Sequence, residues 1–313
     1  MADLALLLLT LAWGTTFHFV KGVLEVSSPG VFLTARFGLA SLALGAVALA
    51  RRDRTGPGFL RHGALLGLFM LAGFVLQTLG LHRTTPARSG FITGLAVLIV
   101  PFVARFFLGR RVRAASWAGV ALAVAGLAVL TRPFGAGVSA EVRLGDLLTA
   151  GCAAAFALQI TFIAEWSPRH PLVAFTFAQV FVTFLGVAAM LPVEAVRFDA
   201  AGAGVFAGTV AFTGLAMTAL AFFVQNWGQR HTTAVRAALI FSLEPVAAAL
   251  FSHFYGGEAL GLFDWAGGGL IALGVVAGEV GGALEHRGAR RAASELGERP
   301  GERATEARGR DLC

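Results

Sequence analysis

The chain has 313 residues, of which 57% are hydrophobic and only 14% are charged, and its mean hydropathy is +0.75. Because soluble domains carry about a quarter charged residues, this composition excludes an ordinary soluble protein and indicates a chain that crosses a membrane several times. The formal net charge of +7 lies mostly in short loops and the C-terminal segment, and without a basic face interleaved with aromatic residues it predicts no nucleic-acid partner.

Ten apolar stretches follow one another along the chain, and about 20 apolar residues suffice to cross a bilayer. The first stretch has no basic residue before it and continues through Trp13, so we expect a retained helix and not a cleaved signal peptide. Backbone in lipid must satisfy its own hydrogen bonds, so the predicted fold class is an all-α polytopic membrane protein. The predicted helices are 3–21, 30–50, 62–81, 87–108, 115–131, 146–165, 172–192, 202–226, 232–253 and 262–282.

The segment 84–128 recurs without a gap at 232–276, with 12 of 45 positions identical at an offset of 148. Five helices in each half is an odd number, so the second half enters the membrane from the opposite face, and the repeat is inverted. Such halves enclose a substrate cavity near the bilayer midplane. The predicted organisation is a first repeat at 1–131, an extracytoplasmic linker at 132–145, a second repeat at 146–282 and a charged cytoplasmic tail at 283–313.

Basic residues predict the orientation. The side that holds the N-terminus carries 18 Lys and Arg residues, the opposite side carries 6, and Arg36 lies within the second predicted helix. Because basic residues accumulate in cytoplasmic loops, we expect both termini in the cytoplasm, in a bacterial inner membrane.

Several strings of residues resemble the EamA branch of the drug/metabolite transporter superfamily. They are the Trp13-Gly14 pair with polar residues and Phe17 after it, the pair Arg36-Phe37, the stretch GLHRTTPARSGFITGLAVLIVPFVA, the string SLEPVAAAL at 242–250, and Trp265-Ala266-Gly267. The resemblance implies a ten-helix exporter of small metabolites, amino acids or drugs, built of two inverted five-helix repeats with both termini inside. One departure is Arg110, which stands where the first repeat of the family usually carries Glu.

Glu244 is the most informative candidate for a transport role. It lies near the middle of the ninth predicted helix, where a carboxylate is costly unless it is paired or hydrated. Pro245 removes a backbone donor beside it. The residue either binds a proton or cation in the cavity or ties its helix to a neighbour.

Arg36 and His18 are the next candidates. Arg36 lies about 6 residues inside the second helix, where it is expected to attract a substrate carboxylate, pair with Glu244, or anchor its helix. His18 lies near the outer end of the first helix, and its titration range suits proton coupling, although an interfacial position is the alternative.

Neutral polar residues are distributed over several helices, where they either line the cavity or join helix to helix. For the hydroxyl groups the alternative is a bond to their own helix backbone, and the Trp13 ring offers a flat wall for a ligand or an interface anchor. We expect the phenylalanines mainly in packing or facing lipid. The set of polar and aromatic candidates is Trp13, Thr16, Gln77, Thr93, Gln159, Gln179, Thr213, Gln225 and Ser242.

Arg88 and Arg236 occupy matched positions of the repeat, and opposite insertion places one near the outside and one near the inside. The symmetry predicts gate or headgroup contacts. Gly274, Gly278 and Gly282, four residues apart, permit close helix packing or a homodimer.

Cofactor motifs are missing from the sequence. Two cysteines, Cys152 and Cys313, cannot form a disulfide framework or a four-cysteine metal site. No glycine-rich phosphate loop and no His/Glu metal motif occurs, so we expect no cofactor, no metal and no ATP hydrolysis by the chain itself.

These features favour a secondary transporter, with a small molecule and the lipid bilayer as partners and with proton coupling as an energy source. An alternative is a membrane-embedded lipid-modifying enzyme, which would need clustered His, Asp or Glu at one membrane face. The longest internal loop, 132–145, is too short to hold such a cluster. A scaffolding protein would need neither the duplication nor a midplane carboxylate.

Overall fold

The computed structural model describes residues 1–84, 86–131, 139–256, 261–263 and 265–278. Within these ranges the chain is helical, has no β-strand, and contains one isolated β-bridge, between Ser27 and Phe198. Eight helical segments are long and apolar enough to cross a membrane, and two shorter apolar helices accompany them. The predicted fold class, an all-α polytopic membrane protein with ten crossings, is therefore confirmed.

The first five crossings contain six helices because the fourth crossing is interrupted. They are α1 (Ala2–Val26), α2 (Pro29–Arg51), α3 (Phe59–Arg83), α4 (Pro86–Gly94) with α5 (Ala96–Leu108), and α6 (Ala114–Thr131).

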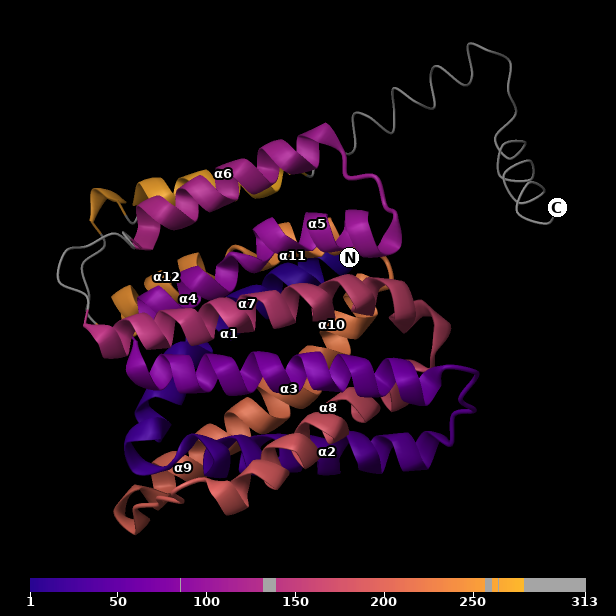
Figure 1. Cartoon of the computed structure of the whole chain (residues 1–313), viewed down its shortest axis with the longest axis vertical. Coiled ribbons are helices and arrows are strands. Elements are labelled where there is room, and N and C mark those ends of the chain that lie inside the picture. Colours follow the sequence, from indigo (N-terminus) through magenta and orange to yellow (C-terminus); the bar gives the residue numbers. More distant parts are fainter. Residues whose placement is uncertain (85, 132–138, 257–260, 264, 279–313) are drawn as a thin grey trace.

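Among the last five crossings, the ninth is interrupted at 242–243, and the eighth contains a π-helical segment. The sixth crossing is α7 (Ala140–Trp166) with η1 (Ser167–Arg169), and the seventh is α8 (Leu172–Met190) with η2 (Leu191–Val193). The eighth consists of η3 (Ala200–Gly202), α9 (Ala203–Ala211), η4 (Phe212–Leu220) and α10 (Ala221–Gln229). The ninth is α11 (Ala234–Phe241) with α12 (Glu244–Gly256), and the tenth is the helix Trp265–Gly278, which has no label in Figure 1. The segment η4 is a π-helix.

Two predicted helix ends differ most from the structure: α1 continues to Val26, past its predicted end at 21, and α7 begins before its predicted start at 146. The helix α7 begins at Ala140, within the stretch predicted as a linker, because the Ser139 hydroxyl caps it by accepting a hydrogen bond from the Val142 N–H at 3.3 Å. Glu141 in the first turn adds a favourable charge at the helix N-terminus. The rest of the predicted linker (132–138), the predicted tail and Gly282 lie outside the described residues.

Contacts between the last helices of the two halves obey a twofold relation. A Cβ built on Gly119 would lie 2.6 Å from the Gly274 carbonyl oxygen, and a Cβ built on Gly126 would lie 2.6 Å from the Gly267 carbonyl oxygen. Gly119 matches Gly267 in the repeat and Gly126 matches Gly274, so exchanging the two repeats converts one contact into the other. The helix Trp265–Gly278 thus packs closely against α6, at the top of Figure 1.

The same contacts bear on the predicted homodimer. Gly274 faces Gly119, and a Cβ on Gly278 would lie 2.4 Å from Leu239 Cδ1. Both glycines therefore lie against helices of the same chain, as expected if their spacing permits close packing of helices.

The interruptions of the fourth and ninth crossings also match. One lies at Leu95, between α4 and α5, and the other includes Leu243, between α11 and α12, which is the same position of the repeat. The second interruption precedes Pro245, which cannot donate a backbone hydrogen bond. A Cβ on Gly94 would lie 3.5 Å from Pro245 Cγ, so the two interrupted helices meet each other in the bundle.

Candidate functional site

A cavity lies between the two repeats, beside the interruptions in both broken helices. It contains about 890 Å³ of space free of atoms, including space open to solvent. Its walls come from α1 to α5 in the first half and from α7 and α10 to α12 in the second half. The lining residues are Trp13, Thr16, Phe17, Val20, Arg36, Phe74, Gln77, Thr78, Leu81, Thr93, Gly94, Ala96, Val97, Phe156, Gln159, Ile160, Phe222, Gln225, Ala238, Phe241, Ser242 and Glu244.

Glu244 is the first residue of α12, directly after the interruption at 242–243. The first turn of a helix presents free backbone N–H groups and a partial positive charge, which favour a carboxylate at this position. Within the described ranges, no ion pair involves Glu244. The cavity therefore contains a carboxylate whose position depends on its own helix and not on a basic partner.

Arg36 lies on the α2 wall and is 4% exposed. Its Nε donates a hydrogen bond to Thr218 Oγ1 at 2.8 Å, and its Nη2 donates to the Met217 carbonyl oxygen at 3.5 Å. The Phe74 ring lies beneath the guanidinium, with its centroid 4.7 Å from Cζ, which is a cation–π distance. No acidic residue of the described chain pairs with Arg36, so the predicted ion pair with Glu244 is not formed.

Amides and an indole provide neutral polar groups in the cavity. The Gln77 amide nitrogen donates to Thr93 Oγ1 at 3.3 Å, and Trp13 Nε1 donates to the Met217 carbonyl oxygen at 3.2 Å. The amide nitrogen of Gln159 and the amide oxygen of Gln225 are both buried, and neither has a hydrogen-bond partner in the part of the chain that the structure describes. A buried polar atom without a partner is unfavourable, so these two amides are suited to bind a polar ligand or water.

Two predicted hydroxyl residues line the cavity but bond to their own helices. The Thr16 hydroxyl donates to the Trp13 carbonyl oxygen at 2.7 Å, and the Ser242 hydroxyl donates to the Leu239 carbonyl oxygen at 2.6 Å. Their protons are therefore already used within the protein.

Three predicted residues lie outside the cavity lining. The Thr213 hydroxyl donates to the Thr209 carbonyl oxygen at 2.6 Å, and the Gln179 amide nitrogen donates to Asn226 Oδ1 at 3.0 Å. The His18 ring lies edge-on to a phenylalanine on α12, with a centroid distance of 6.0 Å. Thr213 thus bonds to the backbone of its own helix and Gln179 bonds to a neighbouring helix, which are the structural roles given above as alternatives to lining the cavity.

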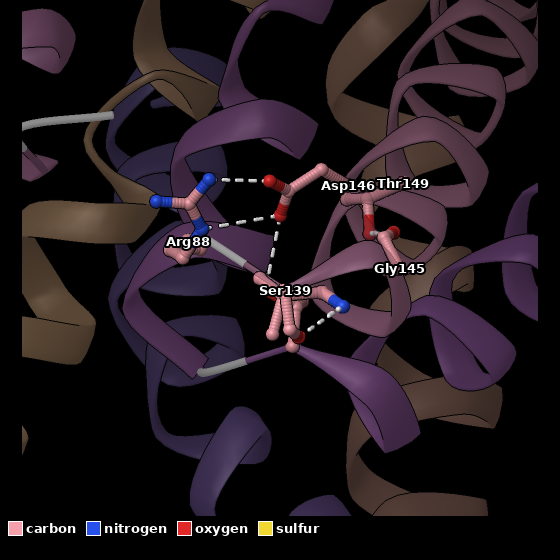
Figure 2. Close-up of polar contacts among 7 residues, drawn as sticks. Arg88, Ser139, Gly145, Asp146 and Thr149 are labelled. Carbon is pink, nitrogen blue, oxygen red and sulfur yellow. Dashed lines mark hydrogen bonds and ion pairs between the residues drawn. The ribbon is translucent and has the colours of Figure 1, made fainter. Parts of the chain in front are cut away.

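Arg88 pairs with an acidic residue of the other repeat. Its Nε donates to Asp146 Oδ1 at 3.2 Å, its Nη2 contacts Asp146 Oδ2, and Figure 2 shows the guanidinium facing the carboxylate. Thr84 Oγ1 also donates to Asp146 Oδ1, at 3.0 Å. Asp146 belongs to the first turns of α7, so this two-point contact joins the start of α4 to the start of α7.

Arg236 forms the corresponding pair at the other end of the bundle. Its Nη2 lies 2.8 Å from Asp3 Oδ2, which joins the start of α11 to the start of α1. Figure 1 places the N-terminus at the right of the view, opposite the left-hand start of α7. Each pair thus joins a broken helix of one repeat to the first helix of the other, and the two arginines occupy matched positions of the repeat.

Sequence reasoning did not find several residues of the site. Phe74, Phe156 and Phe222 form much of the cavity wall, although the phenylalanines were expected mainly in packing or facing lipid. Phenylalanines on neighbouring positions of apolar helices give no signal that separates these roles. Thr218 was also missed, because a threonine in an apolar run normally bonds to its own backbone.

Comparisons with known proteins agree with this architecture. The sequence model of the EamA-like transporter family matches residues 1–132 and 143–277. A protein of Archaeoglobus fulgidus that bears the name uncharacterized transporter is 31% identical over 275 residues, covering 88% of this chain and 84% of its own length.

The uncharacterized inner membrane transporter YedA of Escherichia coli strain K12 is 26% identical over 285 residues, covering 87% of this chain and 88% of its own. One crystal structure with 22% sequence identity superposes with a TM-score of 0.70 and covers 89% of this chain and 97% of that chain. That likeness concerns the fold alone.

Proposed function

Because the chain belongs to the EamA-like transporter family and is a multi-pass membrane transporter, we propose that it exports a small metabolite, amino acid or drug by alternating access. The observation that supports this most is the cavity bounded by both repeats, which holds two ionisable groups, Arg36 and Glu244, that form no ion pair with any described residue. A transporter keeps such groups for its cargo or its coupling ion. Rocking of one repeat against the other would expose this cavity to each side in turn.

We place both termini in the cytoplasm of a bacterial inner membrane, on the basis of the distribution of basic residues. In this orientation the ion pair of Asp3 and Arg236 lies at the cytoplasmic end, and the pair of Arg88 and Asp146 lies at the opposite end. We propose that each pair is a latch that closes its own end of the cavity. Because each latch joins the two repeats, opening that end requires its ion pair to separate.

Proton exchange at Glu244 is the proposed energy source. The carboxylate lies in the cavity and at the interruption of a helix, where it can be reached from either side in turn. A proton taken up on the outside and released inside would drive cargo outward.

The test is flux from liposomes reconstituted with purified protein, using cargo found by a thermal-shift screen of amino acids, nucleobases and quaternary amines. Glu244→Gln should remove the dependence of flux on a pH gradient, because glutamine cannot carry the proton. Glu25→Gln, at an exposed glutamate on α1, is the matched control and should behave like the unaltered protein. Unchanged pH dependence in Glu244→Gln would remove this residue from the mechanism.

A further inference from the structure

The guanidinium of Arg36 is only half used by the protein. An arginine has five N–H donors in a fixed planar fork. Nε and Nη2, which share one edge of that plane, donate to Thr218 Oγ1 and to the Met217 carbonyl oxygen. The two Nη1 hydrogens and the second Nη2 hydrogen remain. One Nη1 hydrogen and this Nη2 hydrogen form the end edge of the fork, which can bind a carboxylate with two parallel bonds.

The π-helix η4 explains why the first edge is held firmly. Thr218 Oγ1 donates its own proton to the Thr213 carbonyl oxygen, five residues earlier, at 2.8 Å. Its lone pairs are therefore left to accept the Arg36 Nε–H. Wider turns of this kind occur frequently at functional sites, because they release backbone and side-chain groups from the regular helical pattern.

The surroundings leave Arg36 without a counter-ion. The side chain is 4% exposed, Phe74 covers one face, and no acidic residue of the described chain forms an ion pair with it. Taking a charge out of water without a partner is costly. A guanidinium does not avoid that cost by losing its proton. A ligand that supplies the negative charge would offset this cost within the cavity.

We propose that the end edge of Arg36 binds a carboxylate of the transported molecule, and that Thr218 is the positioning residue that directs this edge into the cavity. The rest of the molecule is apolar or aromatic, because Phe74, Phe156 and Phe222 face the same space. This inference rests on the proposed transport function, whose substrate class it narrows to small molecules with a free carboxylate.

The amides define one more feature of the ligand. Gln159 and Gln225 leave one amide nitrogen and one amide oxygen unpartnered in the cavity. Each can bind a neutral polar group on the body of the molecule. Charge recognition therefore depends on Arg36, while the amides adjust which carboxylates fit.

The experiment measures binding to the purified full-length protein with a matched panel: 3-phenylpropanoate, 3-phenylpropanamide, 3-phenylpropylamine and phenylalanine. The two carboxylates should raise the unfolding temperature, and the amide and amine should not. Arg36→Lys should weaken carboxylate binding about tenfold or more, because an ammonium keeps the charge but lacks the planar fork.

Thr218→Val and Thr218→Ser separate positioning from packing. Valine has nearly the shape of threonine but no acceptor, so carboxylate affinity should fall about tenfold, as for the loss of a hydrogen bond to a charged group. Serine keeps the acceptor and should bind within about twofold. A merely structural role would instead change the unfolding temperature of the ligand-free protein while leaving carboxylate affinity near that of the unaltered protein.

Binding of the amide or amine as tightly as the acid, failure of both carboxylates to bind, or unchanged affinity in Arg36→Lys would each overturn the assignment. The proposed function fails in a different way. If carboxylates bind through Arg36 but nothing crosses the liposome membrane, the binding site stands and transport does not. If a cation is carried without dependence on Arg36, transport stands and the carboxylate site does not.

Discussion

Replacing Arg88 by glutamine should open the extracytoplasmic end of the cavity. The pair of Arg88 and Asp146 makes a two-point contact with side chains 20% and 19% exposed, whereas the side chains of the pair Arg236 and Asp3 are 44% and 39% exposed. An exposed ion pair stabilises the state in which it forms by about 1 kcal/mol or less, and a charge-assisted two-point contact stabilises it by about twice as much. We therefore expect Arg88→Gln to favour the outward-open state by about 1–2 kcal/mol, a shift of about 5- to 30-fold.

The assay is labelling of Leu81→Cys, at the outer part of the cavity wall, by a membrane-impermeant maleimide. The background carries Cys152→Ala and Cys313→Ala, which remove the native thiols. Arg88→Gln should raise the labelling rate about 5- to 30-fold. Arg236→Gln is the matched control and should lower it by less than about fivefold, because it opens the opposite end. Equal labelling in all three proteins, or a change of the same sign in both variants, would refute the latch reasoning.

Three further predictions use other parts of the molecule. Gly119→Val should lower the free energy of unfolding by about 1–3 kcal/mol in a detergent melt, because its Cβ would lie 2.6 Å from the Gly274 carbonyl oxygen. Gly208→Val, at a helical glycine whose Cβ would meet no atom within 4 Å, is the matched control, and equal melts for the two variants would contradict the close packing. Burial and the neighbouring positive charges lower the pKa of His170, so the folded protein resists its protonation; the unfolding temperature should fall as pH drops below about 6.5, and His170→Gln should flatten that slope. Glu244→Ala with Ala96→Glu should regain pH-dependent flux that Glu244→Ala alone lacks, and failure of the double variant would show that the two repeats are not interchangeable at the cavity.

Much of the architecture could be predicted because hydropathy and charge act locally along the chain. The ten crossings follow from apolar runs between charged loops, and the repeat follows from matched residues such as Trp117 and Trp265. The intramembrane positions of Arg36 and Glu244 also follow from spacing alone. No local sequence signal predicts that both residues line one cavity. That expectation comes from the general architecture of transporters with two repeats, which enclose the substrate site between their halves.

The partners of these residues could not be predicted, because they lie far away in sequence. Asp3 lies in the first turn of α1, where an acidic residue is favourable for the helix itself, and Asp146 lies in the second turn of α7. Nothing in their surroundings distinguishes a latch from an ordinary helix terminus. The π-helix η4 contacts Arg36 of α2 through Thr218, and its sequence, FTGLAMTAL, has no feature that separates it from an α-helix.

The two repeats have the same interrupted helix but differ in the side chain that follows the interruption. Ala96 and Glu244 are matched positions, each is the first residue of a helix after an interruption, and both line the cavity. Only the second repeat carries a carboxylate there. A second carboxylate in the same cavity would repel the first. In the proposed cycle, the single carboxylate of Glu244 in this cavity would be presented to each side in turn, so one proton site would suffice for both states.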